Sequence, residues 1–295
     1  MRELDVELLG GPVHYADFGG GGPPLVMVHG LGGSRLNWLA VGPKLAATHR
    51  VYAVDLLGHG KTPRAGRPAT IANHRRLINA FIEQVAGGPA TLVGNSTGGH
   101  LSILEAALHA EAVAALVLVD PAVPVPVGGA ALPPPAILLV VPLLVRGVGE
   151  ALLRANARRL TPEQLVDRTL RLVSPNPDRI PRELVRAHVE AYLARHGSAE
   201  ADRAFLQTAR SLTAANLRRR RFYALARRVK APVLVVQGAR DRLVPMRAIR
   251  KLLEVRPDWE LHLFPELGHV PMMEDPDAFA EVVGSWLEAL GRKAA

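Results

Sequence analysis

The amino-acid sequence predicts an α/β fold, in which helices cover both faces of a mostly parallel sheet and a helical cap is inserted between two strands. Three observations carry this prediction. Short apolar runs alternate with segments of helical periodicity. The alternation stops between about residues 122 and 229 and then resumes. Of the 295 residues, 48% are apolar and 21% are charged, which is typical of a folded globular chain and argues against disorder.

Six of the apolar runs are expected to be buried strands. Most of them contain almost no polar residue, as in parallel strands that are covered on both faces. These runs are Leu25–Val28, Val51–Val54, Thr91–Val93, Val113–Val119, Val233–Val236 and Leu261–Phe264.

Helices are expected between these strands and at the end of the chain. Ile71–Val85 and Thr97–Leu108 carry apolar residues three and four positions apart, which places them along one face of a helix. Near the C-terminus, Asp275 is expected to cap a helix that begins at Pro276, because proline is favoured at the first helical position.

The middle of the chain is expected to form the cap. It opens with the proline-rich and glycine-rich run Pro121–Gly149 and continues as polar, arginine-rich helical stretches without a convincing strand. We therefore divide the chain into an N-terminal part of the core (1–121), a helical cap (122–229) and a C-terminal part of the core (230–295). The cap should lie over the carboxyl ends of the strands, where ligands bind in open α/β sheets.

Composition limits the chemistry and the partners. The chain has no cysteine, which excludes disulfides, thiolate metal sites and cysteine nucleophiles. Its net charge of +9 comes mostly from dispersed arginines. One basic cluster could contact phosphate, but no nucleic-acid motif accompanies it, so we expect a solvated helix face and no nucleic-acid partner. The cluster comprises Arg218–Arg221, Arg227, Arg228 and Lys230.

The sequence pattern favours neither a secretory signal nor a membrane-spanning helix. The first residues lack the apolar core of a secretory signal, so we expect a cytoplasmic protein. Leu132–Val145 is too short and too rich in proline to span a bilayer as a helix. The first part of the cap, Val123–Val148, could line a hydrophobic pocket, rest on a lipid surface or simply pack within the cap. Contact with a membrane surface and the oligomeric state therefore stay open.

The sharpest local pattern is the run Gly94–Gly99, whose sequence GNSTGG fits G-x-S-x-G between an apolar strand and a helix. A serine on such a tight turn needs small neighbours, and Gly94 and Gly98 supply them. The alternative is a glycine-rich turn with an incidental serine. The flanking strand and helix favour the first interpretation, with Ser96 as a nucleophile.

A second glycine-rich loop, His29–Ser34, follows the strand Leu25–Val28. It can turn a backbone N–H toward Ser96, so we expect an oxyanion hole formed by the N–H groups of Leu31 and Thr97. A phosphate-binding loop is the alternative. It is disfavoured because the sequence has neither a P-loop lysine nor a G-x-G-x-x-G spacing followed by an acidic residue.

Two further residues complete a catalytic set. Asp241 and His269 each follow a predicted strand, in loops at the carboxyl edge of the sheet. We expect His269 to be the general base and Asp241 to orient it. Asp120, which ends the strand Val113–Val119, is an alternative acid, although it could simply cap the turn before Pro121.

With these motifs, the chain resembles the α/β-hydrolase superfamily over nearly its whole length, and the order Ser96, Asp241, His269 is that of the superfamily's triad. Epoxide hydrolases and haloalkane dehalogenases have an aspartate at the position that corresponds to Ser96. Because this chain has a serine there, the resemblance implies an acyl-enzyme. It implies no cofactor and no metal. The matching segments are His14–Asp17, His29–Ser34, Asp55–Gly60, Gly94–Gly99, Gly238–Asp241 and Gly268–His269.

Three other histidines could lie near the site. His29 could contact the oxyanion region, but we expect a structural hydrogen-bonding role because His269 already supplies a base. His59 and His100 could face the pocket, although packed or surface histidines are the default and the spacing suggests no metal set.

The expected function is that of a serine hydrolase, lipase-like or a carboxylesterase, acting on an ester with a hydrophobic acyl or ring portion. Asn95 lies directly before Ser96 in this turn, the nucleophile elbow, and in this the chain also resembles enzymes that hydrolyse carbon–carbon bonds in ring-cleavage products. Such an enzyme would need cap residues arranged for a carboxylate. Thioesterases and cofactor-free haloperoxidases have similar triads. The alternative from another class is a protein that binds a hydrophobic ligand on this fold without turnover.

Overall fold

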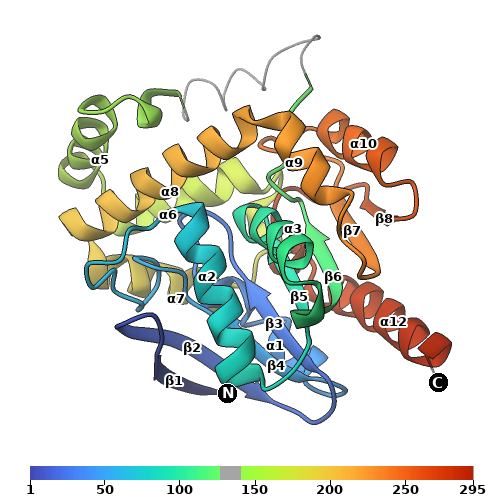
Figure 1. The fold of residues 1–295 in the computed structure, drawn as a ribbon. Coiled ribbons are helices and arrows are strands. Elements are labelled where there is room, and N and C mark those ends of the chain that lie inside the picture. Colours follow the sequence, from blue (N-terminus) through green and yellow to red (C-terminus); the bar gives the residue numbers. More distant parts are fainter. Residues whose placement is uncertain (127–140, 295) are drawn as a thin grey trace.

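A computed structural model describes residues 1–126 and 141–294 and places eight strands in one sheet, in the order β1-β2-β4-β3-β5-β6-β7-β8 (Figure 1). β2 pairs antiparallel with β1 and with β4, and the remaining pairs are parallel. This mostly parallel sheet confirms the predicted fold class. The strands are β1 (Arg2–Glu7), β2 (Pro12–Gly19), β3 (Pro24–Val28), β4 (Arg50–Val54), β5 (Ala90–Asn95), β6 (Val113–Val119), β7 (Val233–Gly238) and β8 (Glu260–Phe264).

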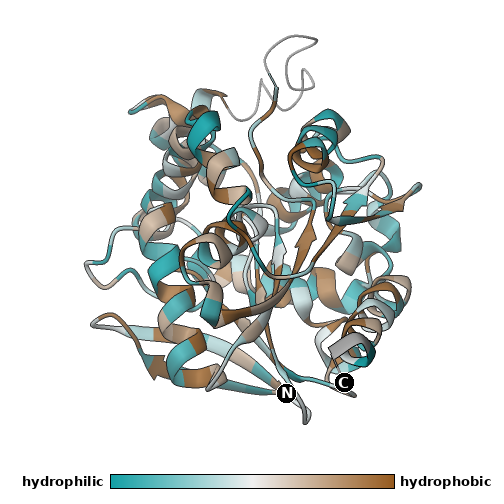
Figure 2. Ribbon diagram, turned by 45° about the vertical axis from the view of Figure 1, so that its right-hand side comes forward, coloured by the Kyte–Doolittle hydropathy of each residue, from teal (hydrophilic) through white to brown (hydrophobic). Residues whose placement is uncertain are grey.

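Helices cover both faces of the sheet, as the buried strands require. In β3, Val26 and Val28 face one core, whereas Leu25 and Met27 face the other. Figure 2 shows brown strands in the interior of the molecule. The first core is covered by α2 (Ile71–Phe81), α3 (Thr97–Leu108), α9 (Arg219–Ala226) and α10 (Met246–Val255), and the second by the 3-10 turn η1 (Arg35–Trp38), α1 (Gly42–Leu45), α11 (Pro271–Glu274) and α12 (Pro276–Ala294).

Local sequence explains where several helices begin and end. α3 coincides with the predicted helix, and α12 begins at Pro276, where the Asp275 carboxylate accepts the N–H of Ala278 at 3.1 Å, as an N-cap does. α2 is shorter than predicted, because its last turn widens into the π-helical turn Ile82–Ala86 before Gly87 ends it at a φ of 75°.

The segment between β6 and β7 contains helices and no strand among its described residues. α9 packs against α3, where the ring of Phe222 stacks on His100 with centroids 5.0 Å apart. The domain boundaries predicted above stay predictions. The other helices of the segment are α5 (Val148–Arg159), α6 (Pro162–Val173), the 3-10 turn η4 (Pro177–Arg179), α7 (Arg182–Arg195) and α8 (Ala199–Leu217).

The apolar first part of the segment is only partly described. Of the predicted features Leu132–Val145 and Val123–Val148, residues 127–140 lie outside the described residues. Across the ranges 1–126 and 141–294, no helix is both long and apolar enough to cross a bilayer.

Candidate active site

Ser96 stands on a strained turn between β5 and α3. Its φ of 54° and ψ of −113° lie where residues with a side chain are rarely found, at a cost of roughly 1–3 kcal/mol. The turn is possible only because its neighbours are glycines. A Cβ on Gly94 would lie 2.5 Å from the backbone of Gly98, and one on Gly98 would collide with the carbonyl oxygen of Val28. The sequence GNSTGG therefore presents Ser96, which is partly exposed, at the carboxyl edge of the sheet.

The two predicted oxyanion donors lie on either side of this turn. Thr97 is the first residue of α3, so its N–H has no acceptor within the helix and stands at the positive end of the helix dipole. Across from it, the loop His29–Ser34 comes close, because a Cβ on Gly30 would lie 3.0 Å from the Cβ of Ser96. Leu31 follows Gly30 in that loop.

Asp241 and His269 form the pair that the sequence analysis proposed. The Nδ1–H of His269 donates to the Oδ2 of Asp241 at 2.7 Å, and the two side chains are 5% and 1% exposed. The Oδ1 of Asp241 accepts the N–H groups of Leu243 at 2.6 Å and Val244 at 3.1 Å. Burial alone would raise the pKa of Asp241, but the charge and hydrogen bond of His269 together with these N–H groups hold it below its ordinary value. Asp241 is therefore a carboxylate that holds the His269 ring.

Asn95 connects the turn that carries Ser96 to the loop that carries His269. Its Nδ2 donates to the carbonyl oxygen of His269 at 3.0 Å and to that of Val119 at 3.2 Å, and the residue is buried. Asn95 therefore brings together the loops that carry Ser96 and His269. The sequence does not predict this role for Asn95, because the partners of Asn95 lie far away in the chain.

The histidine loop is also tied to the end of α6. The N–H of His269 donates to the carbonyl of Val173 at 2.7 Å. The carboxyl of Glu274 accepts the N–H of Gly268 at 2.9 Å and the hydroxyl of Ser174 at 2.7 Å. Burial raises the pKa of Glu274. No motif in the sequence identified Ser174 or Glu274 as supports of the histidine.

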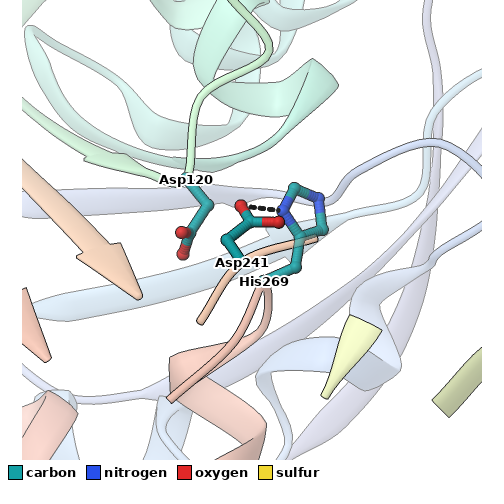
Figure 3. A group of neighbouring side chains, drawn as sticks. All are labelled: Asp120, Asp241 and His269. Carbon is teal, nitrogen blue, oxygen red and sulfur yellow. Dashed lines mark hydrogen bonds and ion pairs between the residues drawn. The ribbon is translucent and has the colours of Figure 1, made fainter. Parts of the chain in front are cut away.

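Asp120 lies beside this pair but does not hold the histidine (Figure 3). It is completely buried, its φ is 45°, and its Oδ1 accepts the N–H of Gly238 at 2.9 Å. Burial, reinforced by the charge of Asp241, raises the pKa of Asp120 well above its ordinary value. The pKa values of Asp120 and Asp241 are therefore shifted in opposite directions, which favours the proton on Asp120. A carboxyl oxygen of Asp120 lies within 4.8 Å of a carboxyl oxygen of Asp241 and of a ring nitrogen of His269.

The other candidate histidines make structural hydrogen bonds. The Nδ1 of His29 donates to the carbonyl of Gly30 at 2.7 Å, and its Nε2 accepts the N–H of Leu56 at 3.0 Å. His59 and His100 bond the carbonyls of Leu57 and Ala122, each at 3.0 Å. Burial lowers the pKa of His29 and His100 to about 4 and that of His59 to about 3, so all three are neutral near pH 7.

A cation from α7 reaches the loop His29–Ser34, the predicted oxyanion loop. The guanidinium of Arg195 donates to the carbonyl of Gly32 at 3.2 Å, one residue beyond Leu31. The residue is partly buried, and burial lowers the pKa of its guanidinium. Its charge adds to the burial that lowers the pKa of His29 and His59. The sequence predicts that a carbon–carbon hydrolase needs cap residues arranged for a carboxylate, but no motif in it identifies Arg195 as one of them.

Comparisons with known proteins identify the family of the chain. Residues 25–282 match the family model described as the alpha/beta hydrolase family. A 2-hydroxy-6-oxononadienedioate/2-hydroxy-6-oxononatrienedioate hydrolase of Burkholderia vietnamiensis is 30% identical over 280 residues, which cover 93% of this chain and 90% of that protein. The dihydrolipoyllysine-residue acetyltransferase component of an acetoin cleaving system of Pseudomonas putida is 29% identical over 97% of this chain and 68% of its own length.

Among solved structures, a serine hydrolase involved in carbazole degradation superposes with a TM-score of 0.70 at 27% identity, covering 98% of this chain and 99% of that one. The family model spans most of the chain, and the similar relatives extend over nearly all of it. The chain is therefore a hydrolase that belongs to the alpha/beta hydrolase family.

Proposed function

We propose that this protein hydrolyses a carbon–carbon bond next to a ketone in a substrate that carries a carboxylate. This reaction, weighed above as the alternative to ester cleavage, becomes our main proposal. The observation that carries it is Arg195, which sets a cap guanidinium beside the oxyanion loop, where it can pair with a substrate carboxylate. The name of the Burkholderia relative, a hydrolase of oxo-dienedioates, supports the same substrate class.

Ser96 would begin the reaction by attacking the ketone carbon with its Oγ while its proton passes to the Nε2 of His269. Because the Nδ1–H of His269 donates to Asp241, the Nε2 is the nitrogen free to accept that proton, and the Asp241 carboxylate stabilises the imidazolium that forms. The N–H groups of Leu31 and Thr97 would hold the oxygen of the tetrahedral intermediate.

The carbon–carbon bond then breaks, and its electron pair leaves with the carbon fragment. This fragment is a poor leaving group unless the charge is delocalised, as in an enolate conjugated with a carboxylate. Arg195 would hold that carboxylate. The imidazolium of His269 returns its proton to the departing carbon, and His269 next activates a water molecule that hydrolyses the acyl-enzyme to a carboxylic acid.

The direct test compares two kinds of substrate. We expect the wild type to consume a 2-hydroxy-6-oxo-dienedioate, followed by the loss of its dienolate absorbance, and Ser96→Ala to lose at least a thousandfold in kcat. Hydrolysis of p-nitrophenyl esters from acetate to palmitate is measured in parallel. Turnover of esters alone would replace this proposal with the esterase function, and binding without turnover of either substrate would favour a binding protein.

Arg195 is tested by Arg195→Gln, with Arg186→Gln as the matched control. Arg186 lies on the same helix, α7, with its side chain 74% exposed. We expect Arg195→Gln to raise KM for the dienedioate about tenfold or more while KM for p-nitrophenyl acetate stays unchanged, because only the first substrate has a carboxylate to pair. An equal change for both substrates would contradict a carboxylate-binding role for Arg195.

A further inference from the structure

A groove separate from the Ser96 site lies along one face of α8. Arg203, Gln207 and Arg210 lie at intervals of four and three residues, so their side chains share that face. The groove has a volume of about 600 Å³. Its walls are a core loop that contributes Arg64 and the segment that contributes Arg146 and Glu150; we call it the arginine groove.

The floor of the arginine groove is fixed to the core. The Oε1 of Gln207 accepts the N–H of Ala69 at 2.8 Å and the guanidinium of Arg64 at 3.3 Å. The hydroxyl of Ser211, also in the groove, accepts the N–H of Ile71 at 3.0 Å at the start of α2. Figure 1 shows α8 passing between α5 and the upper end of α2. The groove therefore joins the core and the inserted segment by polar contacts, one of which fixes the guanidinium of Arg64.

The charges in the groove are unbalanced. Four guanidiniums line it, from Arg64, Arg146, Arg203 and Arg210, against the single lining carboxylate of Glu150. Glu150 is engaged by Arg210, at 2.9 and 3.1 Å. Among the described residues, the only ion-pair partner of Arg64 is Glu200, at 4.0 Å.

Part of this cationic surface is unused. Within the described ranges, Arg146 and Arg203 have no ion-pair partner, and the buried Nε of Arg64 has no hydrogen bond. Arginines gathered in this way repel one another, and an anion with several oxygens would relieve that repulsion while accepting the unused N–H groups.

From this geometry we propose that the arginine groove binds a multiply charged oxyanion of the phosphate class, either a free phosphate or the phosphate groups of an organic ester. The anion would contact Arg64 from the core and Arg146 and Arg203 from the insertion. Because it binds the folded chain only, it should also raise the unfolding temperature. This site does not depend on the reaction at Ser96.

The test is isothermal titration with pyrophosphate at constant ionic strength. We expect one site per chain in the wild type and at least about tenfold weaker binding in the double variant Arg146→Gln/Arg203→Gln, which removes two charge-assisted contacts. The matched control is Arg250→Gln/Arg292→Gln, which removes the same charge from exposed positions on α10 and α12, on the opposite side of the molecule (Figure 1).

The control decides between a site and general attraction to a chain of net charge +9. Equal weakening in both double variants, or no binding by the folded wild type at millimolar pyrophosphate, would refute the proposal. A titration with ADP separates the two sources, because tighter binding than pyrophosphate assigns the site to a phosphate ester and weaker binding assigns it to the free anion. Thermal melts of each variant confirm that the chain is folded.

Discussion

At the residue scale, two carboxyl groups meet beside one imidazole, and their pKa values are shifted in opposite directions. Asp241 receives four hydrogen bonds that favour a carboxylate, from His269, Leu243, Val244 and, at 3.5 Å, from the side chain of Gln237. Asp120 receives one, from Gly238, in a completely buried position. Two adjacent carboxylates repel each other strongly in a buried site, so the proton stays on the group with the weaker hydrogen-bond support.

This difference predicts opposite outcomes for two isosteric changes. Asp120→Asn should keep kcat within about tenfold, because an amide replaces a neutral acid of the same shape. Asp241→Asn should lower kcat about a thousandfold or more, because an amide no longer fixes the Nδ1–H tautomer of His269 or stabilises its charge. Steady-state kinetics with whichever substrate the wild type turns over measures both. A severe loss in Asp120→Asn, with little change in Asp241→Asn, would exchange the roles of the two residues.

At the element scale, the residues that sequence reasoning located best are those with a strong local pattern. β6 begins and ends where its apolar run does, and α3 follows the glycine turn as predicted. β1 and β2 were missed, because β1 is exposed or half-buried along its length and so lacks an apolar run. Pairing with the neighbouring strands of the sheet, rather than local composition, makes this hairpin.

The residues of the candidate site also fall into those that a local pattern predicts and those that it does not. Ser96, Asp241 and His269 could be proposed from the sequence because each follows a strand and the carboxyl ends of parallel strands share one edge. Asn95 and Glu274 could not be assigned roles, because their contacts join segments up to 174 positions apart in the chain. Such contacts depend on how the elements are placed in space, and no short pattern encodes them.

The support of the histidine loop can be tested by removing Glu274. Glu274→Ala leaves the buried N–H of Gly268 and the hydroxyl of Ser174 without their acceptor, which should cost about 2–4 kcal/mol of unfolding free energy. We also expect a lower kcat, because His269 adjoins Gly268. Urea denaturation and steady-state kinetics measure the two effects. Glu281→Ala, at an exposed position of α12, is the control and should change neither.

At the scale of the whole molecule, buried neutral histidines make stability depend on pH. The pKa is about 4 for His29 and His100 and about 3 for His59 in the folded chain, against about 6.5 in an unfolded one. The unfolded chain therefore binds protons first as the pH falls. The contribution of these histidines to the free energy of unfolding is fully present above pH 6.5. It is lost as the pH falls toward 4, at up to about 1.4 kcal/mol per pH unit for each histidine. Asp120 acts in the opposite sense, since its pKa is raised.

One histidine can be isolated by substitution. His100→Asn keeps a donor for the carbonyl of Ala122 but cannot titrate. We expect the unfolding free energy of this variant to fall less steeply between pH 6.5 and pH 5 than that of the wild type, by a slope equivalent to about one proton. Urea denaturation at several pH values gives both slopes. Identical slopes would show that His100 is not a neutral histidine with a depressed pKa.

The hydrogen bond from the N–H of His269 to the carbonyl of Val173 has a consequence for protein engineering. Insertions between β6 and β7 look like interchangeable modules that could be exchanged to change substrate range. In this chain, however, the end of α6 also holds the backbone of His269, the proposed general base, and Ser174 reaches the same loop through Glu274. A chimaera that replaces the insertion must therefore retain Val173 and Ser174. Without them, the exchange would displace His269 as well as change the substrate pocket.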